Sequence, residues 1–216
     1  MQYIYLHGFA SSPKSAKALA MGDRFTKIPI QLNIPDLNAG DFSHLTITRQ
    51  LNQVAAAFPH NYEPVTLIGS SLGGLVSAHL GQQSQQVERL ILLAPAFEFL
   101  SHWLPKLEDD AIKRWQQEKY LMVYHYGEGR SLPLSYDFIT DAEQYQEDIL
   151  QRPVPTLILH GRQDEVIPIR ASRHFAHSRP WVKLVELDSD HALANVTTEI
   201  WQAIHLFCQL PQSSKI

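Results

Sequence analysis

Residues 65–75 read Val-Thr-Leu-Ile-Gly-Ser-Ser-Leu-Gly-Gly-Leu, and this stretch guides the interpretation of the whole chain. It begins with β-branched and apolar residues, which favour a buried strand. It breaks at Gly69, passes Ser71 and two further glycines, and continues with helical spacing toward Gly81, a typical helix stop. The sequence therefore predicts a strand at 65–69, a sharp turn and a helix.

Gly69, Ser71 and Gly73 match the pattern Gly-x-Ser-x-Gly of a nucleophile elbow, in which the serine lies on a strained turn with its hydroxyl exposed. Glycines suit the flanking positions because, without a Cβ, they let the strand and helix backbones pass close together. Ser70 does not fit the nucleophile position, because Ile68 stands two residues before it. Taken alone, the same five residues also fit a solvent-exposed turn or an anion-binding helix start.

The composition is that of a globular protein, and we expect one domain, residues 1–216. Hydrophobic residues make up 44% and charged residues 19% of the chain, a length and composition that bury a core without disulfides or metals. The net charge of -4 provides no basic surface for nucleic acid. No apolar run approaches the length of a bilayer span, so we expect no membrane insertion.

The chain carries one cysteine, Cys208, which has no partner for an intrachain disulfide. Its amino terminus enters an apolar strand-like run directly, without the basic and apolar regions of a secretory signal. Both observations favour a cytoplasmic protein. The last residues, 211–216, are interpreted as a polar tail.

Strand and helix patterns alternate along most of the chain. Short apolar runs predict buried strands at 2–6, 65–69, 89–93, 153–160 and 181–187. A helix is expected at 45–58, and a further strand at 25–32, where Pro29 restricts it to the edge of a sheet. This alternation indicates an α/β fold of three layers, with a mostly parallel sheet between two layers of helices.

Residues 97–149 interrupt the alternation and hold ten of the chain's 21 Phe, Tyr and Trp residues. We expect a helix at 109–120 and a short hairpin formed by 120–126 and 132–138. The segment is interpreted as a cap inserted over the carboxyl edge of the sheet. Its aromatic residues have two explanations of equal weight: they anchor the cap to the body of the protein, or they form the wall of an apolar substrate pocket.

A serine hydroxyl becomes a good nucleophile only when a base takes its proton and a third group orients that base. Ser71, Asp164 and His191 each follow a predicted strand, and the carboxyl ends of parallel strands meet at one edge of a sheet. We therefore expect the three side chains to form a catalytic triad. Asp188 and Asp190 are closer to His191 in sequence, but on the same short loop they are poorly placed to hold the far side of its ring.

The loop after the first predicted strand begins with His7, Gly8 and Phe9. Such a loop can direct the backbone N–H of Phe9 at a developing oxyanion, together with the N–H of Leu72, the residue after the predicted nucleophile. For His7 we favour a structural role, in which its ring nitrogens brace the loop, over a direct part in the chemistry. The remaining histidines show no metal-ligand spacing and no nucleotide-binding loop is present, so we expect neither a metal nor a cofactor.

These motifs together resemble the α/β-hydrolase superfamily. The resemblance covers essentially the whole chain and rests on LHGF at 6–9, GSSLGG at 69–74, HGRQDEVIP at 160–168 and DSDH at 188–191. It implies an α/β-hydrolase fold with about six strands in the order 2-1-3-4-5-6. It also implies that Asp164, and not the adjacent Glu165, is the acidic member of the triad.

The segment LHGFASSPKSAKA at 6–18 is similar to the opening of the small bacterial YqiA/YcfP-type serine esterases. This similarity implies a cofactor-independent serine hydrolase that cleaves carboxylic esters of short to medium acyl chains, with a small-molecule ester as its partner. No oligomeric state is assigned. A thioesterase or a carbon–carbon bond hydrolase would use the same triad, and a non-catalytic interaction protein of the same fold is a further alternative, because fold alone does not secure function.

Overall fold

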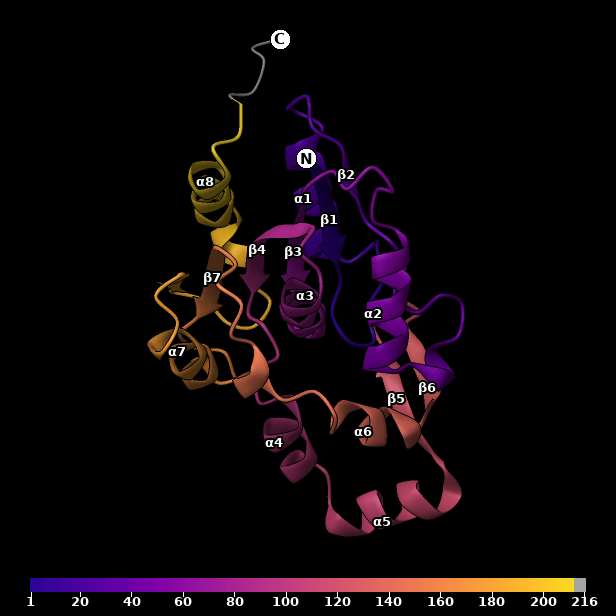
Figure 1. Ribbon diagram of the computed structural model, residues 1–216. Helices are drawn as coiled ribbons and strands as arrows, with labels where there is room; N and C mark the ends of the chain where they lie inside the picture. The colour runs from indigo at the N-terminus through magenta and orange to yellow at the C-terminus, as the bar shows by residue number, and fades with distance from the viewer. Residues whose placement is uncertain (212–216) are drawn as a thin grey trace.

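The computed structural model describes residues 1–211, so the tail predicted at 211–216 lies, after its first residue, outside that range. Its central element is a six-stranded sheet with the spatial order β2-β1-β3-β4-β7-β8, and every neighbouring pair is parallel (Figure 1). The strands are β1 (Gln2–Leu6), β2 (Leu32–Asn33), β3 (Val65–Ser70), β4 (Val87–Leu93), β7 (Thr156–Gly161) and β8 (Val182–Leu187). Numbered within this sheet, the order is 2-1-3-4-5-6, as predicted.

Helices cover both faces of the sheet. One face carries α1 (Ala16–Phe25) and α8 (Thr197–Cys208), and the other carries α2 (Ile47–Ala56), α3 (Leu72–Gln83) and α7 (Ile169–His177). Successive strand residues point to opposite faces, so Ile4 joins the core beneath α2, α3 and α7, whereas Tyr5 joins the core beneath α1 and α8. Because both faces are covered, the central strands β3 and β7 are buried along their whole length and are mostly apolar. The predicted three-layer α/β fold is confirmed.

The edge strand is shorter and lies later in the chain than the sequence predicts. Helix α1 continues as far as Phe25, because the side chains of Met21 and Phe25 pack into the core, and residues 26–29 then form a turn. The strand expected at 25–32 is therefore wrong except at its end, since β2 comprises only Leu32 and Asn33. It pairs with β1 alone, so its predicted position at the edge of the sheet is confirmed.

The chain between β4 and β7 forms an insert, residues 97–149, which lies beyond the carboxyl ends of the central strands (Figure 1). Its elements are α4 (Phe99–Trp103), η2 (Leu104–Lys106), α5 (Asp109–Glu118), β5 (Tyr120–His125), β6 (Arg130–Ser135), α6 (Asp137–Ala142) and η3 (Glu147–Ile149). Strands β5 and β6 pair antiparallel, which confirms the predicted hairpin. The second strand lies earlier than the predicted 132–138, because residues 137 and 138 already belong to α6. The assignment of the insert as the cap of a single domain stays a prediction. Outside it, short 3-10 turns lie at η1 (Phe42–His44) and η4 (Ala194–Val196).

The aromatic residues of the insert fall into two groups. In the first group, Trp103 and Phe138 pack on Phe9, which belongs to the loop after β1, with ring centroids 5.4 and 5.2 Å from that of Phe9. In the second group, Tyr124 and Tyr126 are exposed on the hairpin. The first group fastens the insert to the body of the protein, which is one of the two explanations that the sequence offers for these residues.

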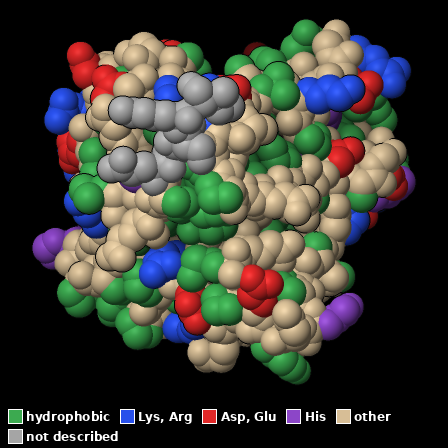
Figure 2. Space-filling model, turned by 90° about the horizontal axis from the view of Figure 1, so that it is seen from above, with side chains coloured by type: hydrophobic (Ala, Val, Ile, Leu, Met, Phe, Trp, Pro, Cys, Tyr) green, Lys and Arg blue, Asp and Glu red, His purple; other side chains and the backbone are tan. Residues whose placement is uncertain are grey.

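The surface of the protein carries both signs of charge. Figure 2 shows the face at the amino ends of the strands, where cationic and anionic side chains are interspersed among uncharged ones. At the edge of the sheet formed by β8, Glu186 pairs with both Arg162 and Arg173. Within residues 1–211, no helix combines the length and the apolar character needed to cross a bilayer.

Trp115 of α5 ties this helix to the hairpin. Its side chain is 1% exposed, and its Nε1–H donates a hydrogen bond to the carbonyl oxygen of Leu134 at 2.9 Å. Trp115→Phe removes the donor, leaves a buried carbonyl without its partner and opens a small void. We expect the variant to lose about 2–4 kcal/mol of unfolding free energy in urea titrations, and to be cleaved faster than wild type within 97–149 during limited proteolysis.

The matched control for this experiment is Trp181→Phe, which changes a partly exposed tryptophan outside the insert. Its insert should be cleaved at the wild-type rate. Equal cleavage rates for Trp115→Phe and wild type would contradict the anchoring role of Trp115.

Candidate active site

Ser71 is the single residue between strand β3 and helix α3. Its backbone has φ 54° and ψ -119°, a conformation that a residue with a side chain keeps only when its surroundings enforce it. The Ser71 N–H donates to the carbonyl oxygen of Leu93 at 3.0 Å, and the Ser71 carbonyl accepts from the N–H groups of Gly74 and Ala96 at 2.8 and 3.0 Å. Ser71 therefore lies in the strand–turn–helix context that a nucleophile elbow requires.

Glycines allow three backbones to approach one another around Ser71. A Cβ added at Gly69 would overlap the carbonyl oxygen of Gly73, and a Cβ added at Gly73 would overlap the carbonyl oxygen of Leu6. Gly8 is also adjacent, because its added Cβ would lie 3.2 Å from the Cβ of Ser71. The loop after β1 is thereby held beside the Ser71 side chain.

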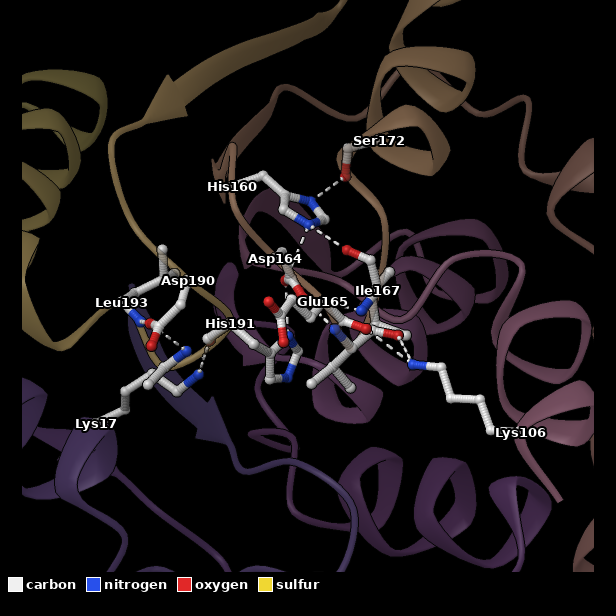
Figure 3. Close-up of polar contacts among 12 residues, drawn as sticks. Lys17, Lys106, His160, Asp164, Glu165, Ile167, Ser172, Asp190, His191 and Leu193 are labelled. Atoms are coloured by element: carbon white, nitrogen blue, oxygen red, sulfur yellow. Dashed lines mark hydrogen bonds and ion pairs between the residues drawn. The ribbon is translucent and has the colours of Figure 1, made fainter.

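Asp164 and His191 lie on the loops after β7 and β8, and their side chains meet (Figure 3). Asp164 Oδ2 is 2.7 Å from His191 Nδ1. The other carboxylate oxygen, Oδ1, accepts hydrogen bonds from the N–H groups of Val166 and Ile167 at 2.9 and 2.8 Å. Since an ionised carboxylate only accepts hydrogen bonds, His191 Nδ1 carries the proton in this pair and Nε2 is left as the basic nitrogen of the neutral ring.

A second histidine, His160, contacts the same carboxylate and was not recognised in the sequence. This side chain is fully buried, and its Nε2 lies 3.1 Å from Asp164 Oδ2 and 3.0 Å from the carbonyl oxygen of Ile167. Its Nδ1 lies 2.7 Å from Ser172 Oγ (Figure 3). The available signal was the spacing of four residues between His160 and Asp164 across a turn at the end of a buried strand.

Asp164 remains ionised although its side chain is buried. Burial by itself raises the pKa of a carboxyl group, but hydrogen bonds from His160, from His191 and from the Ile167 N–H stabilise the charged form. Together they hold the pKa of Asp164 well below its ordinary range. The negative charge therefore persists at neutral pH and would stabilise an imidazolium formed next to it.

The other acidic residues near His191 make different contacts. Asp190 Oδ1 accepts from the backbone N–H groups two and three residues further on, at 2.9 and 3.2 Å, and Asp188 accepts from the Gln163 side chain at 2.6 Å. Within residues 1–211, neither carboxylate bonds to the His191 ring, so Asp164 is the acidic partner in this geometry. The same part of the chain holds no cluster of three or more His, Cys, Asp or Glu side chains arranged for a metal ion.

The predicted oxyanion donors both have unused N–H groups. In the part of the chain that the structure describes, the backbone N–H groups of Phe9 and Leu72 donate to no acceptor, so both are available to a ligand. Over the same range, no hydrogen bond joins the Ser71 hydroxyl to the His191 ring. The structure thus brings Asp164 and His191 into contact, and places Ser71 at the carboxyl edge of the same sheet.

His7 is buried, and both of its ring nitrogens bond to the backbone. Nδ1 donates to the carbonyl oxygen of Gly8 at 3.0 Å, and Nε2 accepts from the Leu37 N–H at 3.0 Å. Burial lowers the pKa of His7, which keeps the ring neutral and suited to these two contacts. The structural role favoured by the sequence is therefore confirmed: His7 braces the loop that carries Phe9.

The insert contacts the same loop. The Tyr126 N–H, on the hairpin turn, donates to the carbonyl oxygen of Ala10 at 2.8 Å. The Phe9 ring packs against Phe42 and Phe138, with centroids 5.7 and 5.2 Å apart. Aromatic residues thus hold the side chain of Phe9 in place. The backbone N–H of Phe9 has no acceptor among residues 1–211.

The model of the uncharacterised protein family UPF0227 matches residues 2–208. The chain belongs to this family. The match runs from β1 to the end of α8, so it includes Ser71, Asp164 and His191. Among curated proteins, none matches.

Solved structures share the fold of the UPF0227 chain at low sequence identity. A putative hydrolase from Agrobacterium vitis S4 matches with a TM-score of 0.83 and 24% identity over 95% of this chain and 87% of that one. Est1E from Butyrivibrio proteoclasticus, with ferulic acid bound, matches with a TM-score of 0.78 and 22% identity over 96% and 89%. The mouse alpha/beta hydrolase domain-containing protein 10 gives 0.76 and 22% over 96% and 90%. These likenesses confirm the α/β-hydrolase fold that the sequence motifs indicate.

Gly73→Ala and Gly22→Ala should change the unfolding free energy in opposite directions. Gly73→Ala places a methyl group against the carbonyl oxygens of Leu6 and His7, so we expect a loss of about 3 kcal/mol or more in unfolding free energy, or insoluble protein. Gly22→Ala lies inside α1, where the nearest atom to the added carbon is 3.7 Å away. It should gain up to about 1 kcal/mol from helix propensity. Urea unfolding of both variants tests this, and equal stabilities would contradict it.

The low pKa of Asp164 predicts a pH-dependent contribution to stability. A carboxylate whose pKa falls on folding stabilises the native state above its unfolded pKa, about 4, and this stabilisation is lost as the pH falls toward the folded pKa. We expect Asp164→Asn to be less stable than wild type at pH 7, and the difference to shrink below about pH 4. Urea midpoints at pH 7, 4 and 2.5 measure it, with Asp188→Asn as the exposed control. A constant difference across this range would contradict the assignment.

Proposed function

We propose that this protein is a serine hydrolase that cleaves carboxylic esters through Ser71, His191 and Asp164. The observation that carries the proposal is the buried Asp164 carboxylate on His191 Nδ1, at the sheet edge that also holds Ser71 in its strained turn. A histidine held in this tautomer keeps Nε2 ready to accept a proton. Ser71, on its strained turn beside the loop that follows β1, supplies the hydroxyl whose proton Nε2 would accept.

The reaction would proceed in two halves. In the first, Ser71 Oγ attacks the ester carbonyl carbon while His191 Nε2 takes the serine proton. The tetrahedral intermediate then breaks its bond to the alkoxy oxygen, which receives the proton from His191 and leaves as the alcohol. In the second half, water attacks the acyl-enzyme with His191 as base, and the acid departs as Ser71 regains its proton.

The negative oxygen of each tetrahedral intermediate needs hydrogen-bond donors. The N–H groups of Phe9 and Leu72 suit this role, because neither has an acceptor among residues 1–211. Leu72 is also the first residue of α3, whose N-terminus favours negative charge. Donors already in position stabilise the transition state without reorganisation, and each contributes about 3–4 kcal/mol in comparable sites.

The choice of an ester as substrate rests on likeness to other proteins. Est1E, which has the same fold, was solved with ferulic acid, a carboxylic acid, bound. For this chain we propose esters of short to medium acyl length, because residues 6–18 are similar to the opening of the small bacterial YqiA/YcfP-type serine esterases. A thioester or a carbon–carbon bond would require the same three side chains, so parallel assays on acyl thioesters and vinylogous diketones accompany the main test.

Hydrolysis of p-nitrophenyl esters with acyl chains of two, four, eight and twelve carbons tests the proposal. We expect wild type to turn over the shorter chains best. Ser71→Ala should reduce kcat by about 10³-fold or more, because the members of a triad act as a unit. Ser70→Ala, the adjacent serine that does not fit the motif, is the matched control and should keep most of the activity. Near wild-type activity of Ser71→Ala would overturn the proposal.

If wild type hydrolyses none of the esters, labelling by a fluorophosphonate decides whether Ser71 is reactive. Labelling of wild type and Ser70→Ala, but not of Ser71→Ala, would support an activated serine that acts on another acyl group. Absence of labelling in all three proteins would favour the non-catalytic interaction protein.

A further inference from the structure

A cavity of about 290 Å³ lies between helices α1 and α8, on the face of the sheet that these helices cover. Ser71, Asp164 and His191 are not among the residues that line it, so it is separate from the proposed active site. Its apolar walls include Met21, Leu93, Leu193, Ile200 and Trp201. A cavity of this size and character suits a small apolar molecule.

Lys17 is one of the charged residues that line this cavity. It comes from α1, its side chain is partly buried, and its Nζ donates a hydrogen bond to the carbonyl oxygen of His191 at 3.0 Å (Figure 3). An ammonium group has three donors, and this bond uses one of them. Within residues 1–211, Lys17 makes no salt bridge with a carboxylate. The ammonium is therefore a cation with unused donors beside an apolar space.

The surroundings of Lys17 disfavour its charge. Burial lowers the pKa of Lys17 to about 8, and the more distant carboxylates of Asp164 and Asp190 offset only part of that effect. A buried charge without a close partner is costly, and an anion in the cavity would supply the missing partner.

The remaining charges of the lining also favour an anion. Arg24 and Lys27 line the cavity together with a single acidic residue, Asp23. Asp23 is already paired with Lys27, at 2.6 Å between Oδ2 and Nζ. The lining therefore has an excess of positive charge, carried by Lys17 and Arg24.

We propose that the cavity between α1 and α8 binds a small apolar monocarboxylate, with its carboxylate on Lys17 and its apolar chain against the walls formed by α1 and α8. The Lys17 ammonium, which has no carboxylate partner and lies beside apolar walls, matches the single negative charge of such a molecule. This binding does not depend on the proposed hydrolysis. One consequence rests on the proposed function: the acid released from an ester belongs to the same chemical class.

Calorimetric titration of the protein with hexanoate and with hexanamide tests the proposal, because the two ligands share an apolar chain and differ in charge. We expect wild type to bind hexanoate at least tenfold more tightly than hexanamide. Lys17→Met keeps the aliphatic stem but removes the ammonium, so it should bind both ligands within twofold of each other. Lys14→Met, the same change at an exposed lysine outside the cavity, should keep the tenfold preference.

A second variant locates the site independently of Lys17. Ala20 is exposed on α1 and lines the cavity, so Ala20→Trp should fill it without disturbing the core and should weaken hexanoate binding at least tenfold. Wild-type affinity in Ala20→Trp, a tenfold preference retained in Lys17→Met, or no saturable binding of hexanoate to wild type would each overturn the proposal. Because the titration needs no turnover, an inactive protein that still binds hexanoate would contradict only the proposed function.

Discussion

The close approach of three backbones at the start of α3 is the constraint on which the rest of the site depends. Helix α3 packs so near to β1 and β3 that a side chain at Gly69 or Gly73 would overlap a carbonyl oxygen. This distance leaves one residue, Ser71, to make the whole turn from strand to helix, and so forces its left-handed φ. It also sets the loop after β1 beside Ser71. A packing requirement of the core thus determines where the Ser71 hydroxyl lies.

A second feature of the site is the number of groups that hold one carboxylate. Asp164 receives two backbone N–H groups and two imidazole nitrogens, and this set of donors keeps it ionised in a buried position. A charge without these partners would be far less stable inside the protein. The donors also fix the carboxylate in space, so the ring of His191 is oriented by a group that cannot rotate away. The same hydrogen bonds therefore stabilise the charge of Asp164 and fix the orientation of the His191 ring.

Local sequence patterns predicted the hairpin and the sharp turn at Ser71, because each depends on residues that are neighbours in the chain. The order of the strands followed from the resemblance to the α/β-hydrolases. The edge strand was misplaced, because the packing of Met21 and Phe25 keeps the chain helical as far as Phe25, the residue where the strand was expected to begin. The contact of Lys17 with His191 could not be predicted, since it joins residues 174 apart that only folding brings together. His160 lies four residues from Asp164, but this spacing alone does not show that its ring turns toward the carboxylate. The pairing of His191 with Asp164 followed from the order of the strands.

Phe9 links the loop after β1 to the insert. Its N–H lies on the loop beside the elbow, whereas its ring packs among aromatic residues of the insert, and the next residue accepts a backbone hydrogen bond from the hairpin. The insert is therefore not an exchangeable module. A designer who replaced it with the insert of another protein of this fold would also change the support of Phe9, and would need to redesign both segments together to keep the loop in place.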